Sequence, residues 1–412
     1  MADDSGLPSS VASTQAAFVS AYLQSVRAFR GVLIQAFGAL GIDSARPREA
    51  ARQLGLDKSL VWKLTRVVHE DEPFRIAGFM PGASGMGMVT RAMEASGVNQ
   101  ETLATIMQAY QRYLEMIELH AGDRETLEHM LYGMIGGGDE RFRKSRQSAY
   151  KGNCGIWGVQ SATRVSTHFL AINKDNPGTI DHAQLVGLLG FQRLRPGPAW
   201  PIFQFHSYED TGGELSASLQ AIEDEPDPAF PFYMKGSSTG QLPEMIRSTD
   251  PGSISYEFGD GPIGKTGMCD AYFGYIDTQP KPRYQDEHNR LGELLCIVNT
   301  PIQTLVFDLI VERELGEQIK PESLIYGRAT GPRLGHELRD QRTLVPYTDS
   351  LQRLEPGAHM LTTPHAPSYN AVGEKVMKRM GRSFEDFVCW RLVMQYPVMH
   401  STVAIKFDLP EG

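Results

Sequence analysis

Seven side chains between residues 48 and 66 have types and spacing that suit contact with nucleic acid. Five of them recur with a period close to four and would share one face of a helix: Lys58, Ser59, Trp62, Lys63 and Arg66. Arg48 and Arg52, also four residues apart, would add charge from a preceding helix. Lysine and arginine donate hydrogen bonds to phosphate oxygens and to the edge of guanine. The set therefore predicts recognition of a polyanion.

The charge of this stretch contrasts with that of the whole chain. From Arg46 to Arg66 there are six basic residues against Glu49 and Asp57, a local net charge of +4, whereas the 412 residues together carry −9. An acidic surface excludes non-specific coating of nucleic acid, so any contact must be local. A second basic run lies at residues 141–151, with five basic residues and no acid. It predicts either further phosphate or effector contacts, through Arg141, Arg143 and Lys144, or the solvated face of a helix.

Two short helices joined by a tight turn would position the first set. Residues 48–54 form an amphipathic pattern whose inner side holds Ala50, Ala51 and Leu54. Gly55 follows where the chain must turn, and glycine accepts positive φ without steric cost. Asp57 is a suitable N-cap for a second helix, over residues 58–68. That helix would turn the following side chains inward: Leu60, Val61 and Leu64.

The stretch from residue 47 to residue 67 resembles the helix-turn-helix of prokaryotic transcription regulators. Ala51, Gly55, Val61 and Leu64 fall where that motif places its small, turning and buried residues. The resemblance implies that double-stranded DNA is the partner and that the second helix enters the major groove. By that resemblance, one set would face base edges or phosphates: Lys58, Ser59, Trp62, Lys63, Arg66, Arg48 and Arg52. Lys63 and Arg66 are the residues expected to reach base edges or phosphates.

Each of these features also has a structural interpretation. Helix-turn-helices occur as plain packing units, and Trp62 could belong to the core instead of the DNA-facing side. A long N-terminal helix carries apolar residues with an eleven-residue repeat, which keeps one face apolar along its length. That face would serve either as a dimerisation surface or as packing within its own domain: Phe18, Tyr22, Val26, Phe29, Leu33, Phe37 and Leu40.

The periodicity changes along the chain and predicts an α+β fold. Residues 1–10 are expected to be a disordered tail, residues 11–136 a helical domain with the helix-turn-helix at 46–69, and residues 137–158 a basic connector. From residue 159 to residue 412 a larger β-rich domain with a mainly antiparallel sheet is expected, because short alternating runs replace helical spacing. Its clearest strands would be residues 200–208, 305–311 and 399–409, with one helix at 369–380.

The segment Gly259–Thr266 fits the pattern GxxxxGK[ST] of phosphate-binding loops. In such a loop Lys265 would reach phosphate oxygens and Thr266 would hold magnesium. The preceding residues 253–258 are half polar, however, and Gly267 follows where a helix should begin. The sequence therefore favours a hairpin loop, and a nucleotide-binding protein remains the least favoured alternative.

The remaining chemistry is sparse. Four scattered cysteines and 11 histidines form no zinc pattern, and no nucleophile elbow is present, so the sequence predicts no cofactor, no metal and no catalysis. An isolated acid, Asp308, lies within an apolar strand candidate. No apolar run approaches 18 residues, and the acidic N-terminus lacks a secretory signal, which predicts a cytoplasmic protein without membrane contact.

The sequence as a whole predicts a sequence-specific DNA-binding transcriptional regulator. The C-terminal domain would provide oligomerisation, as a homodimer on symmetry grounds, or sensing of a small-molecule effector. The alternative from another class is a self-assembling structural or scaffold protein whose helix-turn-helix is only a packing unit.

Overall fold

The computed structural model describes residues 9–132, 134, 140–206, 219–250, 253–287, 289–327, 344–345 and 349–412. The chain separates into two compact units, residues 1–136 and 137–412, which are described one at a time. Residues 1–8 of the predicted tail lie outside the described residues, and residues 9 and 10 already belong to the first helix. Among the residues that the structure describes, no helix has both the length and the apolar character needed to cross a bilayer.

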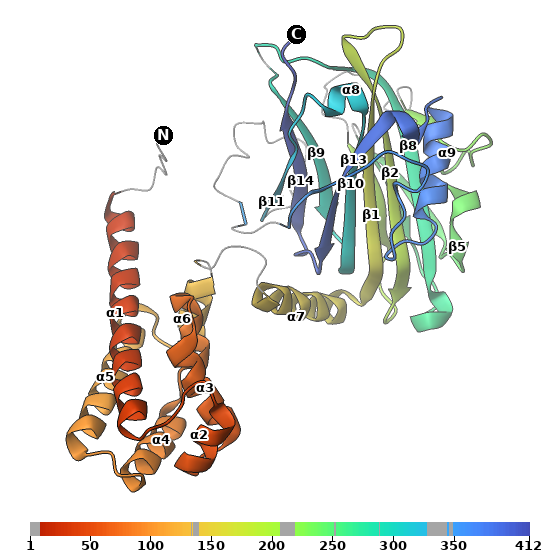
Figure 1. The fold of residues 1–412 in the computed structure, drawn as a ribbon. Helices are drawn as coiled ribbons and strands as arrows, with labels where there is room; N and C mark the ends of the chain where they lie inside the picture. Colours follow the sequence, from red (N-terminus) through yellow and green to blue (C-terminus); the bar gives the residue numbers. More distant parts are fainter. Residues whose placement is uncertain are drawn as a thin grey trace. The chain divides into compact units, whose positions relative to one another are not determined.

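The first unit is helical throughout (Figure 1). Its elements are α1 (Ser9–Ala39), α2 (Pro47–Leu54), α3 (Lys58–His69), the 3-10 helix η1 (Pro73–Phe79), α4 (Ala83–Ala95), α5 (Gln100–His120) and α6 (Arg124–Tyr132). The apolar stripe of α1 packs along α5 and is buried in the core of its own unit, from Phe18 to Phe37. The stripe is thus used in packing within the chain, the second of the two roles that its periodicity predicts.

The second unit begins with α7 (Glu140–Trp157) and is otherwise β-rich. An eight-stranded central sheet has the order β12-β13-β10-β1-β2-β8-β4, and β5 also pairs with β8. Its strands are β1 (Val159–Ile172), β2 (Thr179–Arg193), β4 (Leu219–Ala221), β5 (Thr239–Gly240), β8 (Cys269–Pro282), β10 (Ile302–Glu312), β12 (Gln352–Leu354) and β13 (Phe387–Gln395). Only β1 and β10 pair in parallel among these strands. The predicted α+β fold with a mainly antiparallel sheet is confirmed.

Two three-stranded antiparallel sheets accompany the central one. The first has the order β11-β14-β9 and the second β3-β7-β6. Their strands are β3 (Trp200–His206), β6 (Met245–Asp250), β7 (Ser253–Phe258), β9 (Leu291–Val298), β11 (Glu322–Tyr326) and β14 (Ser401–Asp408). The helical segments between strands are α8 (Arg313–Gly316), α9 (Tyr369–Arg379) and the 3-10 turns η3 (Lys235–Ser237), η4 (Gly264–Gly267) and η6 (Phe384–Asp386).

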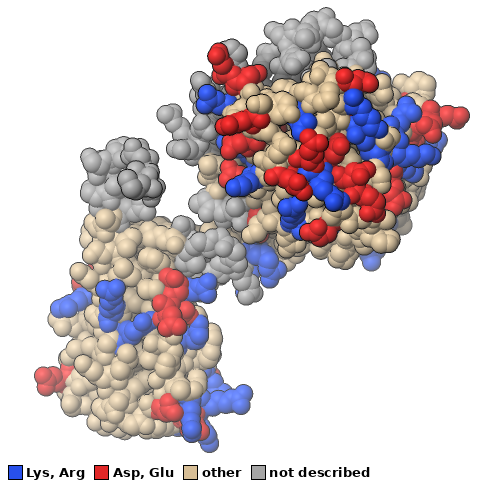
Figure 2. All heavy atoms as spheres, turned by 45° about the horizontal axis from the view of Figure 1, so that its top comes forward, with Lys and Arg blue, Asp and Glu red and all other residues tan. Residues whose placement is uncertain are grey.

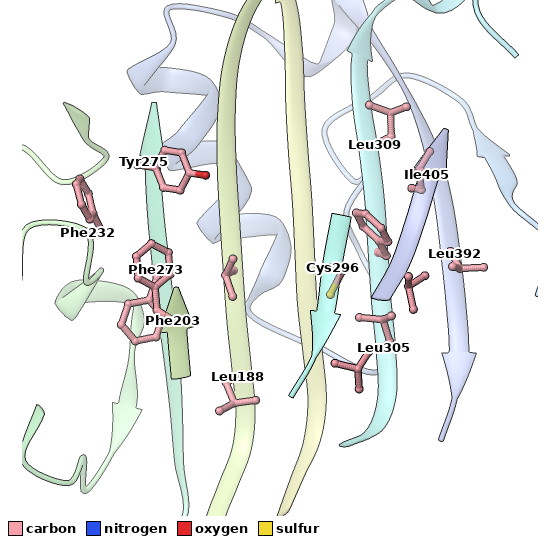
Figure 3. Close-up of a cluster of buried hydrophobic side chains, with 14 of the residues drawn as sticks. Leu188, Phe203, Phe232, Phe273, Tyr275, Cys296, Leu305, Leu309, Leu392 and Ile405 are labelled. Atoms are coloured by element: carbon pink, nitrogen blue, oxygen red, sulfur yellow. The ribbon is translucent and has the colours of Figure 1, made fainter. Parts of the chain in front are cut away.

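Both faces of the central sheet are covered. On one face, α9 packs Tyr369, Val372 and Val376 against apolar side chains of β1, β2 and β10. The other face packs against the two smaller sheets, and Figure 3 shows part of this core, including Leu188 of β2, Phe273 of β8 and Leu305 of β10. A strand buried on both faces has no solvent side to keep polar. This accounts for the nearly unbroken apolar run of residues 305–311.

The basic run after the triple glycine is a helix that packs on the β-rich unit. Within α7, Arg146 is buried and pairs with Asp349 at 3.0 Å, and Tyr150 packs its ring against Tyr396. Residues 137–139 of the predicted connector lie outside the described residues. From Glu140 to Trp157 this segment is therefore part of the second unit's packing.

Candidate nucleic-acid interface

The turn between α2 and α3 has the geometry that its sequence predicts. Gly55 has a φ of 63°, in the left-handed region that favours glycine. Its N–H donates to the carbonyl of Arg52, and the N–H of Leu56 donates to the carbonyl of Ala51 at 3.1 Å. These bonds satisfy carbonyls that the end of a helix leaves open. A residue with a Cβ at position 55 would be strained by its backbone alone.

Asp57 caps α3, as predicted. Its carboxylate accepts from the backbone N–H of Ser59 at 2.8 Å and from the Ser59 hydroxyl group. These hydrogen bonds, first the hydroxyl and then the backbone bond, lower the pKa of Asp57 below its ordinary value. The negative charge of the cap lies at the positive end of the helix dipole, so it fixes where the helix begins.

The inner faces of the two helices belong to the core of the helical unit. Ala50, Ala51 and Leu54 of α2 are buried. Val61 and Leu64 of α3 are fully buried, whereas Leu60, also predicted to point inward, is half-buried. Small residues at 50 and 51 allow close packing, and the buried stripes fix which sides of α2 and α3 remain outside.

Two polar contacts from elsewhere in the unit hold the pair in place. Arg30 of α1 donates from Nε to the carbonyl of Val67 at 2.8 Å and from Nη2 to that of Glu70 at 2.5 Å. A cation at the C-terminal carbonyls of a helix is favourable for its dipole. Gln53 of α2 donates to the carbonyl of Leu40 at 2.8 Å. No short-range pattern marks Arg30, because its partners lie 37 and 40 residues away along the chain.

The outer side carries most of the predicted contact residues. Six of them are exposed: Arg48, Arg52, Lys58, Ser59, Trp62 and Lys63. A surface hollow of about 550 Å³ lies between the first turn of α2 and the N-terminal half of α3. We refer to it as the α2–α3 hollow; its lining is Arg46, Pro47, Arg48, Glu49, Lys58, Ser59 and Trp62. The hollow brings cations from both helices to one concave surface.

Trp62 and Arg66 both contact the ring of Phe79, a residue that no sequence pattern marks. Trp62 is 47% exposed and meets the ring of Phe79 edge-on, with centroids 5.6 Å apart, so the alternative that it is a core residue is wrong. The guanidinium carbon of Arg66 lies 5.1 Å from the centroid of the same ring. Arg66 also pairs with Glu70, and its side chain is 42% exposed. Of the predicted set, it is the residue most engaged within its own unit.

The remaining cations differ in how far they are neutralised. Arg46 pairs with Asp43 and Glu49, each at 3.4 Å. For Arg48, Arg52, Lys58 and Lys63, no ion pair is found among the described parts of the chain. By contrast, on the face of the β-rich unit that Figure 2 shows, acidic and basic side chains are interspersed. Concentrated, uncompensated positive charge is what a phosphate backbone attracts.

The other predicted sites belong to the second unit. Arg143 and Lys144 are exposed on α7 of the second unit, and the side chain of Arg141 lies outside the described residues. The segment 259–266 follows β7, an antiparallel strand between β3 and β6, and leads into η4 and then β8. Because β7 and β8 belong to different sheets, the hairpin prediction is wrong, and the segment is a crossover. η4 is a 3-10 turn of four residues that begins within the segment, and the strand β8 begins at Cys269, so no α-helix between residues 259 and 282 provides the dipole of a phosphate loop.

Metal ligands do not gather anywhere in the described residues: no group of three histidine, cysteine or acidic side chains could hold an ion there. The four cysteines are buried and unpaired with one another.

A scan against protein-family models and a search of curated proteins both find no match to this chain.

Proposed function

We propose that the chain is a DNA-binding transcriptional regulator that reads double-stranded DNA with α3. The observation that carries this proposal is the exposed, uncompensated basic surface of a helix-turn-helix whose inner face is firmly packed. α3 has 12 residues, about 18 Å at 1.5 Å per residue, which is long enough to lie along a major groove. The α2–α3 hollow would then face the phosphates that flank the groove.

The residues divide into two roles in this proposal. Ser59 and Lys63 lie on the exposed side of α3 and would meet base edges. Arg48, Arg52 and Lys58 would bind phosphates, because contacts to the backbone set the register of the helix on the duplex. Trp62 supplies a flat apolar surface suited to sugar or a thymine methyl group. Arg66, engaged with Glu70 and Phe79, would support Trp62 and reach DNA only by exchanging Glu70 for a phosphate.

We also propose that the regulator acts as a homodimer. One helix-turn-helix offers few contacts, and a symmetric pair on two half-sites roughly doubles them. The β-rich unit would provide assembly, sensing of an effector, or both. We place the protein in the cytoplasm on the same functional grounds.

Replacing Lys58 and Lys63 together by alanine is expected to weaken binding to duplex DNA by tenfold or more at low salt. Each lysine lost removes about one phosphate contact and its released counterion, so the slope of log affinity against log salt should fall by up to about 2. Fluorescence anisotropy with a labelled random duplex, at several salt concentrations, measures both quantities.

The matched control is Lys235→Ala/Lys320→Ala, which removes two exposed lysines from the β-rich unit and changes the net charge equally. It should retain the affinity and the salt slope of the unaltered protein. Equal losses in the two double variants would show that only overall charge matters. An unaltered protein that does not bind DNA would favour the alternative in which the motif is a packing unit of a scaffold protein; light scattering would then test for large assemblies.

A further inference from the structure

The β-rich unit encloses a second, larger hollow that the helix-turn-helix does not involve. It has a volume of about 610 Å³ and lies between the central sheet and strands of both smaller sheets. Its floor is formed by β1, β2 and β8, and its other walls by β3, β9 and the end of β14. We call it the inter-sheet cavity. Its volume falls within the range of small-molecule sites, roughly 300–1,000 Å³.

The floor carries a continuous row of hydrogen-bonded side chains. Tyr275 donates from its hydroxyl group to Oε1 of Gln184 at 2.5 Å, and Figure 3 shows that hydroxyl directed toward the neighbouring strand. Nε2 of Gln184 lies 3.4 Å from Nε2 of His168, and Nδ1 of His168 lies 3.0 Å from Nε2 of His182. The two imidazole rings are stacked, with centroids 5.3 Å apart.

The His168 ring also interacts with the backbone carbonyl of Leu295, so the row connects the floor of the cavity with its β9 wall. Nδ1 of His182 has no hydrogen-bond partner among the described residues. Burial holds the pKa of His168 well below its ordinary value and that of His182 at about 4, so both rings are neutral at pH 7.

A second open polar group, in this case a donor, lies toward the other end of the cavity. The Nε of Arg164 on β1 is buried and makes no hydrogen bond with any described residue, and its Nη1 has only a long contact of 3.5 Å with Asn299. Along β1, the position paired with His182 is Leu170, six residues from Arg164. At about 3.3 Å per residue, the lining of the cavity from Arg164 to Leu170 follows about 20 Å of β1.

The walls formed by β3, β9 and β14 contribute aromatic and aliphatic side chains, and the acids and the lysine of the cavity have partners of their own. The apolar side chains include Ile202, Phe203, Phe205, Leu294 and Phe407. Asp277 pairs with Lys281 at 3.1 Å, and Glu293 accepts from Tyr326 at 3.0 Å. A volume of 610 Å³ over about 20 Å gives a mean cross-section of about 30 Å². That width suits one extended chain or one flat ring system.

We propose that the inter-sheet cavity binds one elongated amphipathic carboxylic acid, with its carboxylate on Arg164, its apolar body along the aromatic and aliphatic wall, and a carbonyl or hydroxyl oxygen at His182. Arg164 is the cation of the cavity whose guanidinium has an open donor, so it selects an anion. The neutral histidine and glutamine row offers hydrogen bonds without a second charge, so it selects a monoanion. This inference concerns the β-rich unit alone and does not depend on DNA binding by α3.

The probe for a direct test is 11-(dansylamino)undecanoic acid, whose alkyl chain has a carboxylate at one end and, at the other, a sulfonamide that carries the fluorescent naphthalene ring. Its methyl ester is the uncharged partner. Titrated into the full chain without DNA, the acid should show saturable binding, one molecule per chain, with blue-shifted emission. In Arg164→Met, the dissociation constant for the acid should rise at least tenfold, and that for the ester should stay within about twofold.

Arg247→Met is the matched control, because Arg247 is exposed on β6 and its removal changes the charge of the unit equally. It should bind both compounds as the unaltered chain does. The proposal is overturned if the unaltered chain shows no saturable binding of the acid. It is equally overturned if both arginine variants lose affinity alike, or if Arg164→Met weakens the acid and the ester to the same extent.

Discussion

Replacing Asp308 by asparagine is expected to destabilise the β-rich unit by about 3–5 kcal/mol, the usual cost of leaving a buried charge unpaired. Asp308 is fully buried on β10, and Arg391 lies opposite it on β13. Nε and Nη2 of Arg391 donate to the two carboxylate oxygens at 3.0 and 2.7 Å. Burial raises the pKa of the Asp308 carboxyl group, and the guanidinium opposes that shift. Urea unfolding followed by tryptophan fluorescence measures the loss.

The effect is large because the guanidinium group of Arg391 is buried, so water cannot replace the lost carboxylate. Its remaining donors serve the carbonyls of Thr362 and Met360, and the hydroxyl group of Tyr369 on α9 donates to Asp308 at 2.8 Å. Asparagine keeps the size of the side chain but not its charge. The control is Asp308→Leu/Arg391→Met, which removes both charges and should recover much of the lost stability. If Asp308→Asn costs less than 1 kcal/mol, or if the double variant is no more stable than it, the charge argument is wrong.

The second large effect is a loss of stability in mild acid that the stacked histidines produce. The pKa of His182 is about 4 in the folded unit because burial disfavours the imidazolium, and Asp277 nearby only partly offsets this. In the unfolded chain it returns to about 6.5. Between these values the unfolded state binds more protons, so stability falls as pH falls. From pH 7 to pH 5, His182 alone should account for about 2 kcal/mol.

His168, whose pKa is also lowered, adds to the effect in the same direction. The test compares urea unfolding at pH 7 and pH 5 for the unaltered chain and for His168→Gln/His182→Gln. Carboxylates titrate in both proteins, so the difference between their pH dependences isolates the two histidines. The double variant should lose at least about 2 kcal/mol less stability on acidification. An identical pH dependence in both proteins would rule the histidines out as its source.

The local structure of the helix-turn-helix was predictable because its signals are local. A glycine at a left-handed turn, an aspartate that caps the next helix and two short apolar stripes all act within a few residues, and the structure has each of them. The contacts that orient the pair were not predictable. Arg30 and Phe79 meet α3 through packing of the whole unit, and no short-range pattern marks them.

In the β-rich unit, too, local structure was predictable from the sequence and contacts between distant segments were not. Alternation predicted the strand that is β14, and runs rich in β-branched and aromatic residues predicted β3 and β10, because both signals are properties of one strand alone. Two features depend on the register between strands. One is the parallel pairing of β1 with β10, which are more than 100 residues apart in the sequence. The other is the grouping of His168, Gln184 and Tyr275 on β1, β2 and β8. At 259–266 the sequence predicted a hairpin, and this was wrong because the sheet that the next strand joins is not a local property: β7 and β8 belong to different sheets.

Selection of sequences from a random duplex library at about 150 mM salt tests the central claim most directly. The unaltered chain should enrich a two-fold symmetric sequence, with half-sites about one helical turn apart, because two copies of α3 would read two adjacent major grooves. Lys58→Ala/Lys63→Ala should enrich no such sequence, whereas Lys235→Ala/Lys320→Ala should enrich the same one. If the unaltered chain enriches nothing, or if Lys58→Ala/Lys63→Ala enriches the same sequence equally well, α3 does not read DNA.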